Sequence, residues 1–134
     1  MDHDKLIDKI SGVINDYGTF SESATIDQLL RWKDLLVGYN YHLAEVVSEY
    51  FKNYSRSYYI RKIKISRVKN RLVKEGNPVT ASESQAVEEA AQEYETELEY
   101  EATAERLNNL LRQSNKVVEA MAQRVSVLKT ERHD

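Results

Sequence analysis

The sequence contains no cysteine, a single proline and only four glycines in 134 residues. Without cysteine the chain cannot form disulfides, thiolate metal sites or a cysteine nucleophile, which agrees with a reducing compartment. The scarcity of proline and glycine argues against an all-β fold, because such folds need many tight turns. The hydrophobic content of 41% is too high for a disordered chain, and long runs of Glu, Lys, Leu and Ala are typical of helices.

Several functional signatures are also missing. No segment approaches the roughly 18 consecutive apolar residues of a membrane-spanning helix, and the start MDHDKLIDKI lacks the pattern of a signal peptide. The common phosphate-binding, dinucleotide-binding, nucleophile and zinc-protease motifs do not occur, and the three histidines lie far apart in the sequence. These absences predict a soluble cytoplasmic protein that is not an enzyme and that has no cofactor, no metal and no membrane partner.

Apolar residues at the start of the chain follow a helical spacing. Those from Leu6 to Tyr17 recur every three or four residues, and Gly18 follows them as a candidate stop. This pattern predicts a short amphipathic helix at about residues 4–17.

The central part of the chain has no strong helix breaker before residue 75. We predict one long helix at about residues 22–74, in which Gly38 costs ~1 kcal/mol relative to alanine. The segment YYIRKIKISRV alternates enough to fit a strand as well, but the heptad spacing on both sides of it favours a helix. Two capping boxes are candidate helix starts: Thr19-x-x-Glu22 and Thr25-x-x-Gln28.

The only clear breaker in the chain is the segment EGNP at residues 75–78, which predicts a turn at about residues 75–79. A third capping box follows it, Thr80-x-x-Glu83. We therefore predict a second long helix at about residues 81–130. Two long helices joined by a tight turn must run antiparallel.

Heptad spacing predicts an apolar seam along each long helix. On the first helix the seam residues are Leu29, Trp32, Leu36, Leu43, Val47, Tyr50 and Tyr54, continued by Phe51, Tyr58, Ile65, Val68 and Leu72. On the second helix they are Val87, Ala91, Tyr94, Leu98, Leu107, Leu111, Val118, Met121, Val125 and Leu128.

These elements predict an all-α fold, a long antiparallel helical hairpin with a short N-terminal helix, as a single domain over residues 1–134. About fifty helical residues span roughly 75 Å, and a hairpin of that length buries little core per residue. We therefore expect a homo-oligomer that completes the burial. The expected oligomer contacts are Ile60 and Ile63, on the outer side of the first helix, with Leu111, Val118, Met121 and Val125.

The net charge of −3 averages two segments of opposite sign. Residues 52–74 contain nine Lys and Arg and no acidic residue, whereas residues 83–105 contain nine glutamates and no basic residue. The antiparallel hairpin places these segments side by side, so the charges can pair across the two helices. Not every basic residue points toward the second helix, however. The helical spacing directs Lys52, Arg56, Arg67 and Lys74 outward, whereas Lys62 and Lys69 flank the seam.

A second interpretation of the basic segment is phosphate binding. Clustered Lys and Arg release counterions when they bind nucleic acid, and interleaved tyrosines can stack on unpaired bases. Pairing and binding do not exclude each other, and the sequence leaves both open. The candidate nucleic-acid-binding residues are Arg56, Tyr59, Lys62, Lys64, Arg67, Lys69, Arg71 and Lys74.

The chain resembles the UvsY-type recombination mediators of tailed phages. The resemblance is carried by the early LLRWKDLL, by the basic, tyrosine-containing NYSRSYYIRKIKISRVKNR, and by the breaker with the acidic ASESQAVEEAAQEYETELEYEATAERL. The closing segment LLRQSNKVVEAMAQRVSVLK is the closest match. Together these segments cover most of residues 20–130, and they are helical patterns, not catalytic signatures.

The resemblance implies a homo-oligomer that binds single-stranded DNA through basic residues, with a recombinase or a single-strand-binding protein as partner. The dense acidic segment departs from the family pattern and would compete with DNA for the basic one. We predict a non-enzymatic accessory factor that binds single-stranded DNA in phage recombination or replication. The alternative is a structural or protein-binding coiled-coil module, such as an assembly chaperone or an inhibitor of a host protein, that uses its acidic segment.

Overall fold

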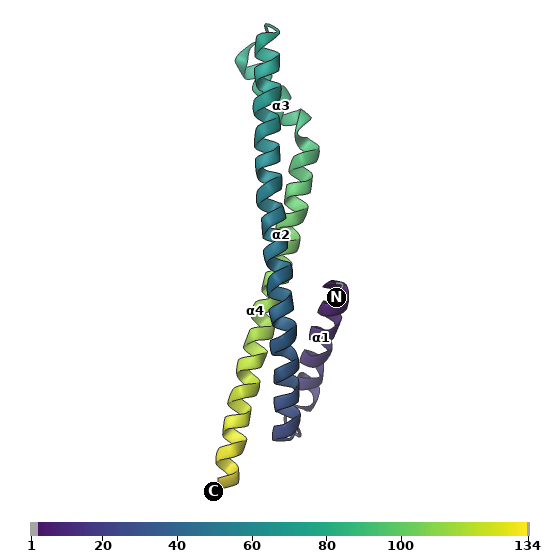
Figure 1. The fold of residues 1–134 in the computed structure, drawn as a ribbon, viewed down its shortest axis with the longest axis vertical. Helices are drawn as coiled ribbons and strands as arrows, with labels where there is room; N and C mark the ends of the chain where they lie inside the picture. Colours follow the sequence, from purple (N-terminus) through teal and green to yellow (C-terminus); the bar gives the residue numbers. More distant parts are fainter. Residues whose placement is uncertain (1–2, 134) are drawn as a thin grey trace. The chain divides into compact units, whose positions relative to one another are not determined.

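The computed structural model describes residues 3–133, with side chains for residues 3–132. Its elements are four helices (Figure 1): α1 (His3–Phe20), α2 (Ile26–Lys74), α3 (Val79–Glu89) and α4 (Ala91–His133). The long helices α2 and α4 pack antiparallel, and the short α1 accompanies them, which confirms the predicted all-α hairpin. The segment YYIRKIKISRV lies within α2, so the strand alternative is wrong. Within residues 3–133 no helix combines the length and the apolarity needed to cross a membrane.

The contacts divide the chain into two compact units. Unit 1 contains α1, the first part of α2 up to Val47, and α4 from Arg106 onward. Unit 2 runs from Ser48 to Glu105 and contains the rest of α2, the turn, α3 and the first part of α4.

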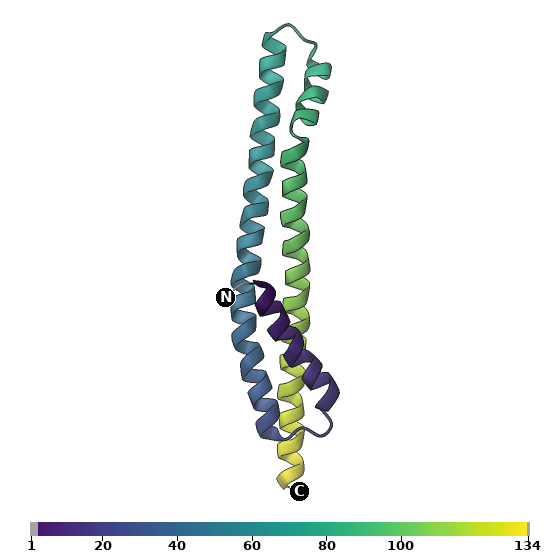
Figure 2. The same cartoon turned by 90° about the vertical axis from the view of Figure 1, so that its right-hand side faces the viewer.

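Unit 1 is built from three packed helical segments, which belong to α1, α2 and α4. In Figure 2, α1 crosses α2 and α4 at an incline, and it buries Leu6, Ile10 and Val13. The ring of Tyr17 meets Trp32 of α2 edge-on, with the ring centroids 6.4 Å apart. The remaining core of this unit is aliphatic: Leu29, Leu36, Leu43, Val47, Leu107, Met121 and Val125.

A polar cluster interrupts this aliphatic core. The Asn40 amide donates to Asn115 Oδ1 at 2.9 Å, and the buried Ser114 hydroxyl donates to Asn40 Oδ1. The hydrogen bonds satisfy polar groups that would otherwise be costly to bury. A single Asn on a helix seam is known to fix the register of paired helices, so this cluster aligns α2 with α4 in unit 1.

The turn between α2 and α3 ends the first long helix in a Schellman motif. The Asn77 N–H donates to Leu72 O at 3.1 Å, and the Gly76 N–H donates to Val73 O at 3.0 Å. Gly76 has φ 95, the left-handed conformation that this motif requires and that glycine adopts at no steric cost. The predicted breaker therefore acts through Gly76, and Pro78 directly precedes α3.

Replacing Gly76 with alanine should lower the free energy of unfolding by about 1 kcal/mol, because the added Cβ disfavours a positive φ. No neighbouring atom lies within 4 Å of that Cβ, so the cost is conformational strain alone. Gly38→Ala is the matched control: the site is helical and equally uncrowded, so this variant should gain roughly 0.5–1 kcal/mol. Urea unfolding followed by circular dichroism measures both, and a stabilised Gly76→Ala would contradict the assignment.

The helix starts differ in part from the capping boxes. The Thr25 hydroxyl accepts a hydrogen bond from the Gln28 N–H at 3.1 Å, as the second box predicts. The first box is wrong, because α1 continues through Gly18 and ends at Phe20. The third box is also wrong. No side chain caps α3, which starts directly after Pro78.

The predicted second long helix is interrupted at Ala90, between α3 and α4. Ala90 has φ −94 and ψ 10, and its N–H is shared between the carbonyls of Ala86 and Val87 at 3.1 and 3.2 Å. Shared hydrogen bonds of this kind are typical of helix ends. No Gly or Pro stands at this position, so nothing in the sequence predicts the interruption.

The predicted seam is correct in unit 1, and in unit 2 it is wrong by one residue on α3 and α4. Two series of residues at seven-residue spacing form the true seam on α3 and α4. One consists of Leu107, Tyr100, Glu93 and Ala86, and the other of Ala104, Glu97 and Ala90. All seven are buried or half-buried. The predicted residues each follow a true seam position and are exposed: Val87, Ala91, Tyr94 and Leu98. On α2 the predicted seam residues Tyr50, Tyr54 and Val68 are buried or half-buried, as are Ser57 and Lys64, which the prediction missed. Of the predicted α2 residues in unit 2, Phe51 is exposed.

The displacement has a physical reason. The spacing of apolar residues predicts the core positions. In unit 2, however, the helix face that continues the repeat carries small and charged residues. Ser57, Ser82, Ala86, Ala90 and Ala104 are buried there, and ion pairs fill the space between the helices.

Candidate functional site

The basic part of α2 and the acidic part of α3 and α4 pair across unit 2, as the antiparallel arrangement predicts. Four basic side chains of α2 each reach a glutamate of the facing helix. The pairs are Arg61–Glu97, Lys64–Glu93 at 2.7 Å, Lys69–Glu83 at 2.9 Å and Arg71–Glu89 at 3.4 Å. This pairing holds the two helices in register.

The pair Arg61–Glu97 is the most buried of the four. The Arg61 side chain is 17% exposed and that of Glu97 only 5%. The guanidinium donates to both carboxylate oxygens and lies over the rings of Tyr58 and Tyr94, with centroids 5.5 and 4.7 Å away. The hydrogen bond to Glu97 is the main cause that raises the pKa of Arg61, so the guanidinium stays positively charged.

The pair Lys64–Glu93 is half-buried and lies one turn away. The hydrogen bond from the Lys64 ammonium is the main cause that lowers the pKa of the Glu93 carboxyl below its usual 4.5. Only Oε1 of Glu93 receives this bond, and the buried Oε2 has no hydrogen-bond partner.

The ion pair of Glu93 with Lys64 makes the stability of unit 2 decrease at acid pH. A lowered pKa in the folded state means that the stabilisation is complete above the usual carboxyl pKa and is lost as the pH falls through the lowered value. Lys64→Gln should raise the pKa of Glu93 and reduce the loss of melting temperature between about pH 5 and pH 3. Carbon-detected NMR titration of the carboxyl measures this pKa directly. Lys62→Gln is the control, because Lys62 has no acidic partner among the described residues; an equal effect of both variants would contradict the assignment.

The pairing engages three residues of the predicted nucleic-acid surface. Lys64, Lys69 and Arg71 are engaged with glutamates of their own chain, so a phosphate would have to displace an existing ion pair to reach them. Their role in binding DNA stays a prediction, and the surface described next does not depend on them. Lys62 is exposed, but its ammonium lies over the Tyr58 ring at 5.5 Å, toward a different side of α2 from Arg56.

The other predicted basic residues remain unpaired. They belong to a stripe of exposed residues on α2, spaced by four and three, which we call the outer stripe: Arg56, Ile60, Ile63, Arg67, Asn70 and Lys74. This spacing places all six on one helix face over a length of about 27 Å. None of its three cations makes an ion pair within the described part of the chain.

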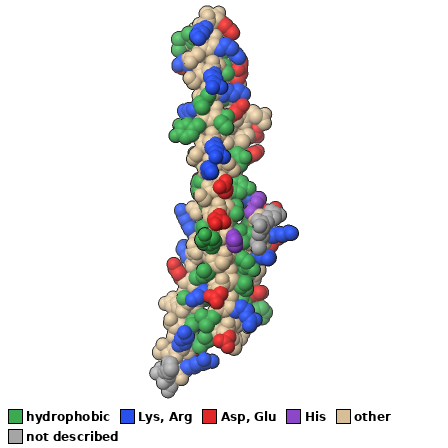
Figure 3. All heavy atoms as spheres, viewed as in Figure 1, with side chains coloured by type: hydrophobic (Ala, Val, Ile, Leu, Met, Phe, Trp, Pro, Cys, Tyr) green, Lys and Arg blue, Asp and Glu red, His purple; other side chains and the backbone are tan. Residues whose placement is uncertain are grey.

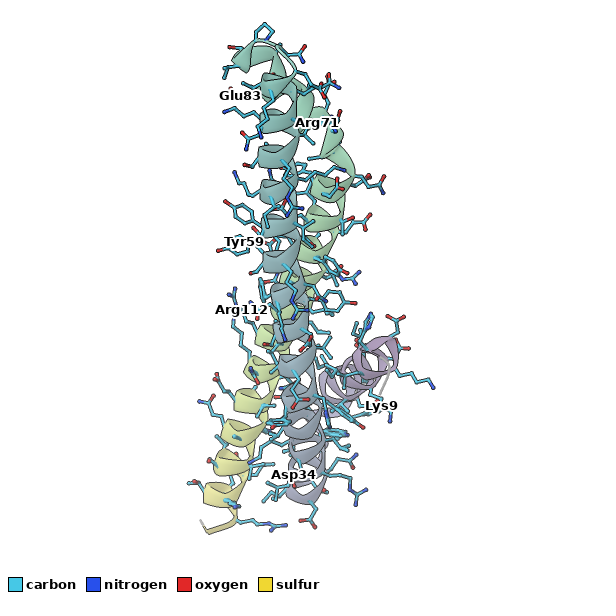
Figure 4. All side chains as sticks on the ribbon, turned by 45° about the horizontal axis from the view of Figure 1, so that its top comes forward. Lys9, Asp34, Tyr59, Arg71, Glu83 and Arg112 are labelled. Atoms are coloured by element: carbon cyan, nitrogen blue, oxygen red, sulfur yellow. The ribbon has the colours of Figure 1, made fainter. Side chains whose placement is uncertain are left out.

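Two further residues extend the outer stripe. Tyr59 is 65% exposed, and Figure 4 shows it directed outward from α2. Its ring is held edge-on by Tyr58, with centroids 5.5 Å apart. Lys52 lies one turn before Arg56 and is also exposed. In Figure 3, Lys and Arg side chains of unit 2 gather along α2, with acidic side chains toward its α3–α4 edge.

The acidic segment also retains unpaired residues. Four exposed glutamates of α3 and α4 make no ion pair within residues 3–132: Glu88, Glu95, Glu99 and Glu105. Glu101 is half-buried and accepts a hydrogen bond from Tyr54, which raises the pKa of that phenol. Unit 2 therefore has a basic outer surface on α2 and an acidic one on α3 and α4.

Two of the predicted oligomer contacts lie in the core. Met121 and Val125 are 0% and 5% exposed within unit 1, so they pack against their own chain and offer no surface to a second copy. Leu111 and Val118 are half-buried in the same unit. Ile60 and Ile63 are 57% and 50% exposed, which confirms their predicted position on the outer side of α2.

Sequence reasoning missed the Arg61–Glu97 pair. The sequence contains a signal for it, because Arg61 stands seven residues from both Tyr54 and Val68, which are predicted seam residues. A charged residue at a seam position predicts a partner of opposite charge on the facing helix.

The described residues contain no group of three or more His, Asp or Glu side chains placed to hold a metal ion. The chain also matches no protein family, no curated protein and no solved structure in the comparisons.

Proposed function

We propose that the protein is a non-enzymatic accessory factor that binds single-stranded DNA along the outer stripe of α2. The observation that carries the proposal is the division of the basic segment into two sets. Four cations neutralise glutamates between the helices, whereas Arg56, Arg67 and Lys74 face outward without an acidic partner in the described chain.

The composition of the outer stripe supports a flexible polyanion as the ligand. Its three cations are spread along one helix face at intervals of eleven and seven residues, so they suit an extended charge and not a single phosphate. Tyr59 and the exposed Ile60 and Ile63 supply apolar surface for unpaired bases, which duplex DNA does not expose. The resemblance to the UvsY-type mediators adds recombination as the process and a recombinase or single-strand-binding protein as partner.

Fluorescence anisotropy of a labelled single-stranded oligonucleotide, titrated at several salt concentrations, tests the proposal. We expect binding at low salt and a log–log salt slope of roughly −2, since each of three phosphate contacts contributes about −0.7 on single strands. A duplex of the same sequence should bind more weakly, because its bases cannot stack on tyrosine. The absence of binding at low salt would rule the function out.

A second candidate uses the acidic surface. The unpaired Glu88, Glu95 and Glu99, at spacings of seven and four, form a negatively charged side on α3 and α4 that fits a basic protein. In that case the protein acts as a protein-binding coiled-coil module. Binding of a polycationic peptide without any binding of single-stranded DNA would favour this candidate.

A further inference from the structure

Unit 2 exposes large apolar side chains on one side of the helix pair. This side, which we call the open face, is formed by the residues that follow the seam positions. Its members are the exposed Phe51 and the half-buried Tyr58, Ile65 and Leu72 on α2, with the exposed Val87, Tyr94 and Leu98 on α3 and α4. Val87, Tyr94 and Leu98 are 58%, 47% and 44% exposed.

The two helices contribute to the open face together. Ile65 and Arg61 of α2 line a hollow of about 380 Å³ with Val87, Ala91 and Tyr94 of the facing helices. The hollow lies on the opposite side of unit 2 from the outer stripe. Ile60 of that stripe lines a different depression, with Gln92 and Thr96.

The open face lacks the cover that the core of unit 1 has. In unit 1 a third helix, α1, buries Leu6, Ile10 and Val13 against α2 and α4. Within its described residues unit 2 consists of a single pair of facing helices, and its seam contains mainly small residues and ion pairs. On the open face Phe51, Val87, Tyr94 and Leu98 therefore face solvent, where contiguous apolar surface indicates an interaction site.

The charges along the edges of the open face identify the partner. On the α2 edge Lys62 lies between Tyr58 and Ile65, at spacings of four and three. On the other edge Glu95 lies between Ala91 and Leu98 at the same spacings. Neither makes an ion pair in the described chain. The pairs Arg61–Glu97 and Lys64–Glu93 put Lys62 and Glu95 at nearly the same height along the unit.

The open faces of two copies are complementary in charge when a twofold axis parallel to the helices relates them. A twofold axis parallel to the helices stacks α2 of one copy on α4 of the other at the same height, so each Lys62 meets a Glu95. A twofold axis across the helices would instead stack α2 on α2 and bring lysines together. Isologous interfaces need such self-complementarity, and flanking charges select helix partners.

We infer that the open face is a homodimer interface, in which the helix pairs of two unit 2 copies form a four-helix arrangement around Phe51, Ile65, Val87, Tyr94 and Leu98. The interface is independent of the proposed DNA surface, because the outer stripe lies on the other side of α2. It also replaces the predicted contacts in α4 that are buried in unit 1.

Light scattering coupled to size-exclusion chromatography tests the dimer. The wild type should elute as a dimer, and Leu98→Glu should raise the dissociation constant roughly 100-fold or more, because an unpaired carboxylate would be buried. Ile63→Glu is the matched control: it is equally exposed but lies on the outer stripe, so this variant should remain dimeric. If Leu98→Glu loses helicity, Val87→Glu, at the more exposed position, replaces it.

A charge exchange tests the symmetry. Lys62→Glu and Glu95→Lys should each weaken the dimer about tenfold, and the double variant should restore it. A monomeric wild type, a dimer that survives Leu98→Glu and Val87→Glu, or a double variant weaker than both single variants would overturn the inference. Single-stranded DNA binding measured on the same samples reports separately on the proposed function, since Leu98→Glu leaves the outer stripe intact.

Discussion

Replacing Glu97 with leucine should lower the free energy of unfolding by about 3 kcal/mol, because it leaves the Arg61 guanidinium unpaired between the helices. The cost is at the lower end of the range for a buried pair, since the Arg61 side chain keeps 17% exposure and contacts two tyrosine rings. Urea unfolding measures the loss, and amide hydrogen exchange should show increased opening around Arg61.

The double variant Arg61→Met/Glu97→Leu distinguishes the contribution of the ion pair to stability from that of side-chain packing. Removing both charges eliminates the unpaired group, so this variant should recover most of the lost stability or exceed the wild type. Glu99→Leu is the control, because Glu99 is exposed and unpaired in the described chain, and its replacement should change stability by less than about 0.5 kcal/mol. A Glu97→Leu variant as stable as Glu99→Leu would show that the pair is dispensable.

Neutralising the outer stripe should abolish most of the single-stranded DNA binding. The triple variant Arg56→Gln/Arg67→Gln/Lys74→Gln removes three unpaired cations without breaking an ion pair in the described chain. We expect roughly 100-fold weaker binding at low salt and a salt slope about 2 less steep. Circular dichroism should be unchanged, because all three side chains are exposed.

The control must remove the same charge elsewhere. Arg106, Arg112 and Lys116 are exposed residues of α4 in unit 1 and make no ion pair within residues 3–132; Arg112 is labelled in Figure 4. Their replacement with glutamine should leave the salt slope within experimental error of the wild type. Equal losses in both triple variants would mean that DNA responds only to net charge, and the outer stripe would then not be the binding surface.

The candidate site was predictable to the extent that it follows from helical spacing. The outward direction of Arg56, Arg67 and Lys74 depends only on residues per turn, and the structure agrees with it. The engagement of Lys64 and Arg71 was not predictable in the same way. It depends on which glutamate lies opposite, and hence on the register and phase of a second helix.

The pattern of apolar residues does not predict which helix face of α3 and α4 turns to the core in unit 2. Val87, Tyr94 and Leu98 have helical spacing and high hydrophobicity, so a pattern of apolar residues favours them as core. They are exposed because Ala86, Glu93 and Glu97, one residue earlier, continue the repeat that the core of unit 1 establishes. A shift of one residue rotates a helix face by about 100°, which is enough to exchange core for surface.

The sequence by itself determined the all-α class, the turn at Gly76, the antiparallel order of the long helices and the opposition of their charges. These properties depend on local propensity, turn chemistry and chain connectivity, all of which are written in consecutive residues. Only the tertiary structure decided which cations are neutralised, that Arg61 and Glu97 are buried, and which apolar side chains remain open. Those outcomes depend on contacts between residues 14 to 36 positions apart on facing helices, where small side chains and ion pairs can occupy a seam as well as apolar residues do.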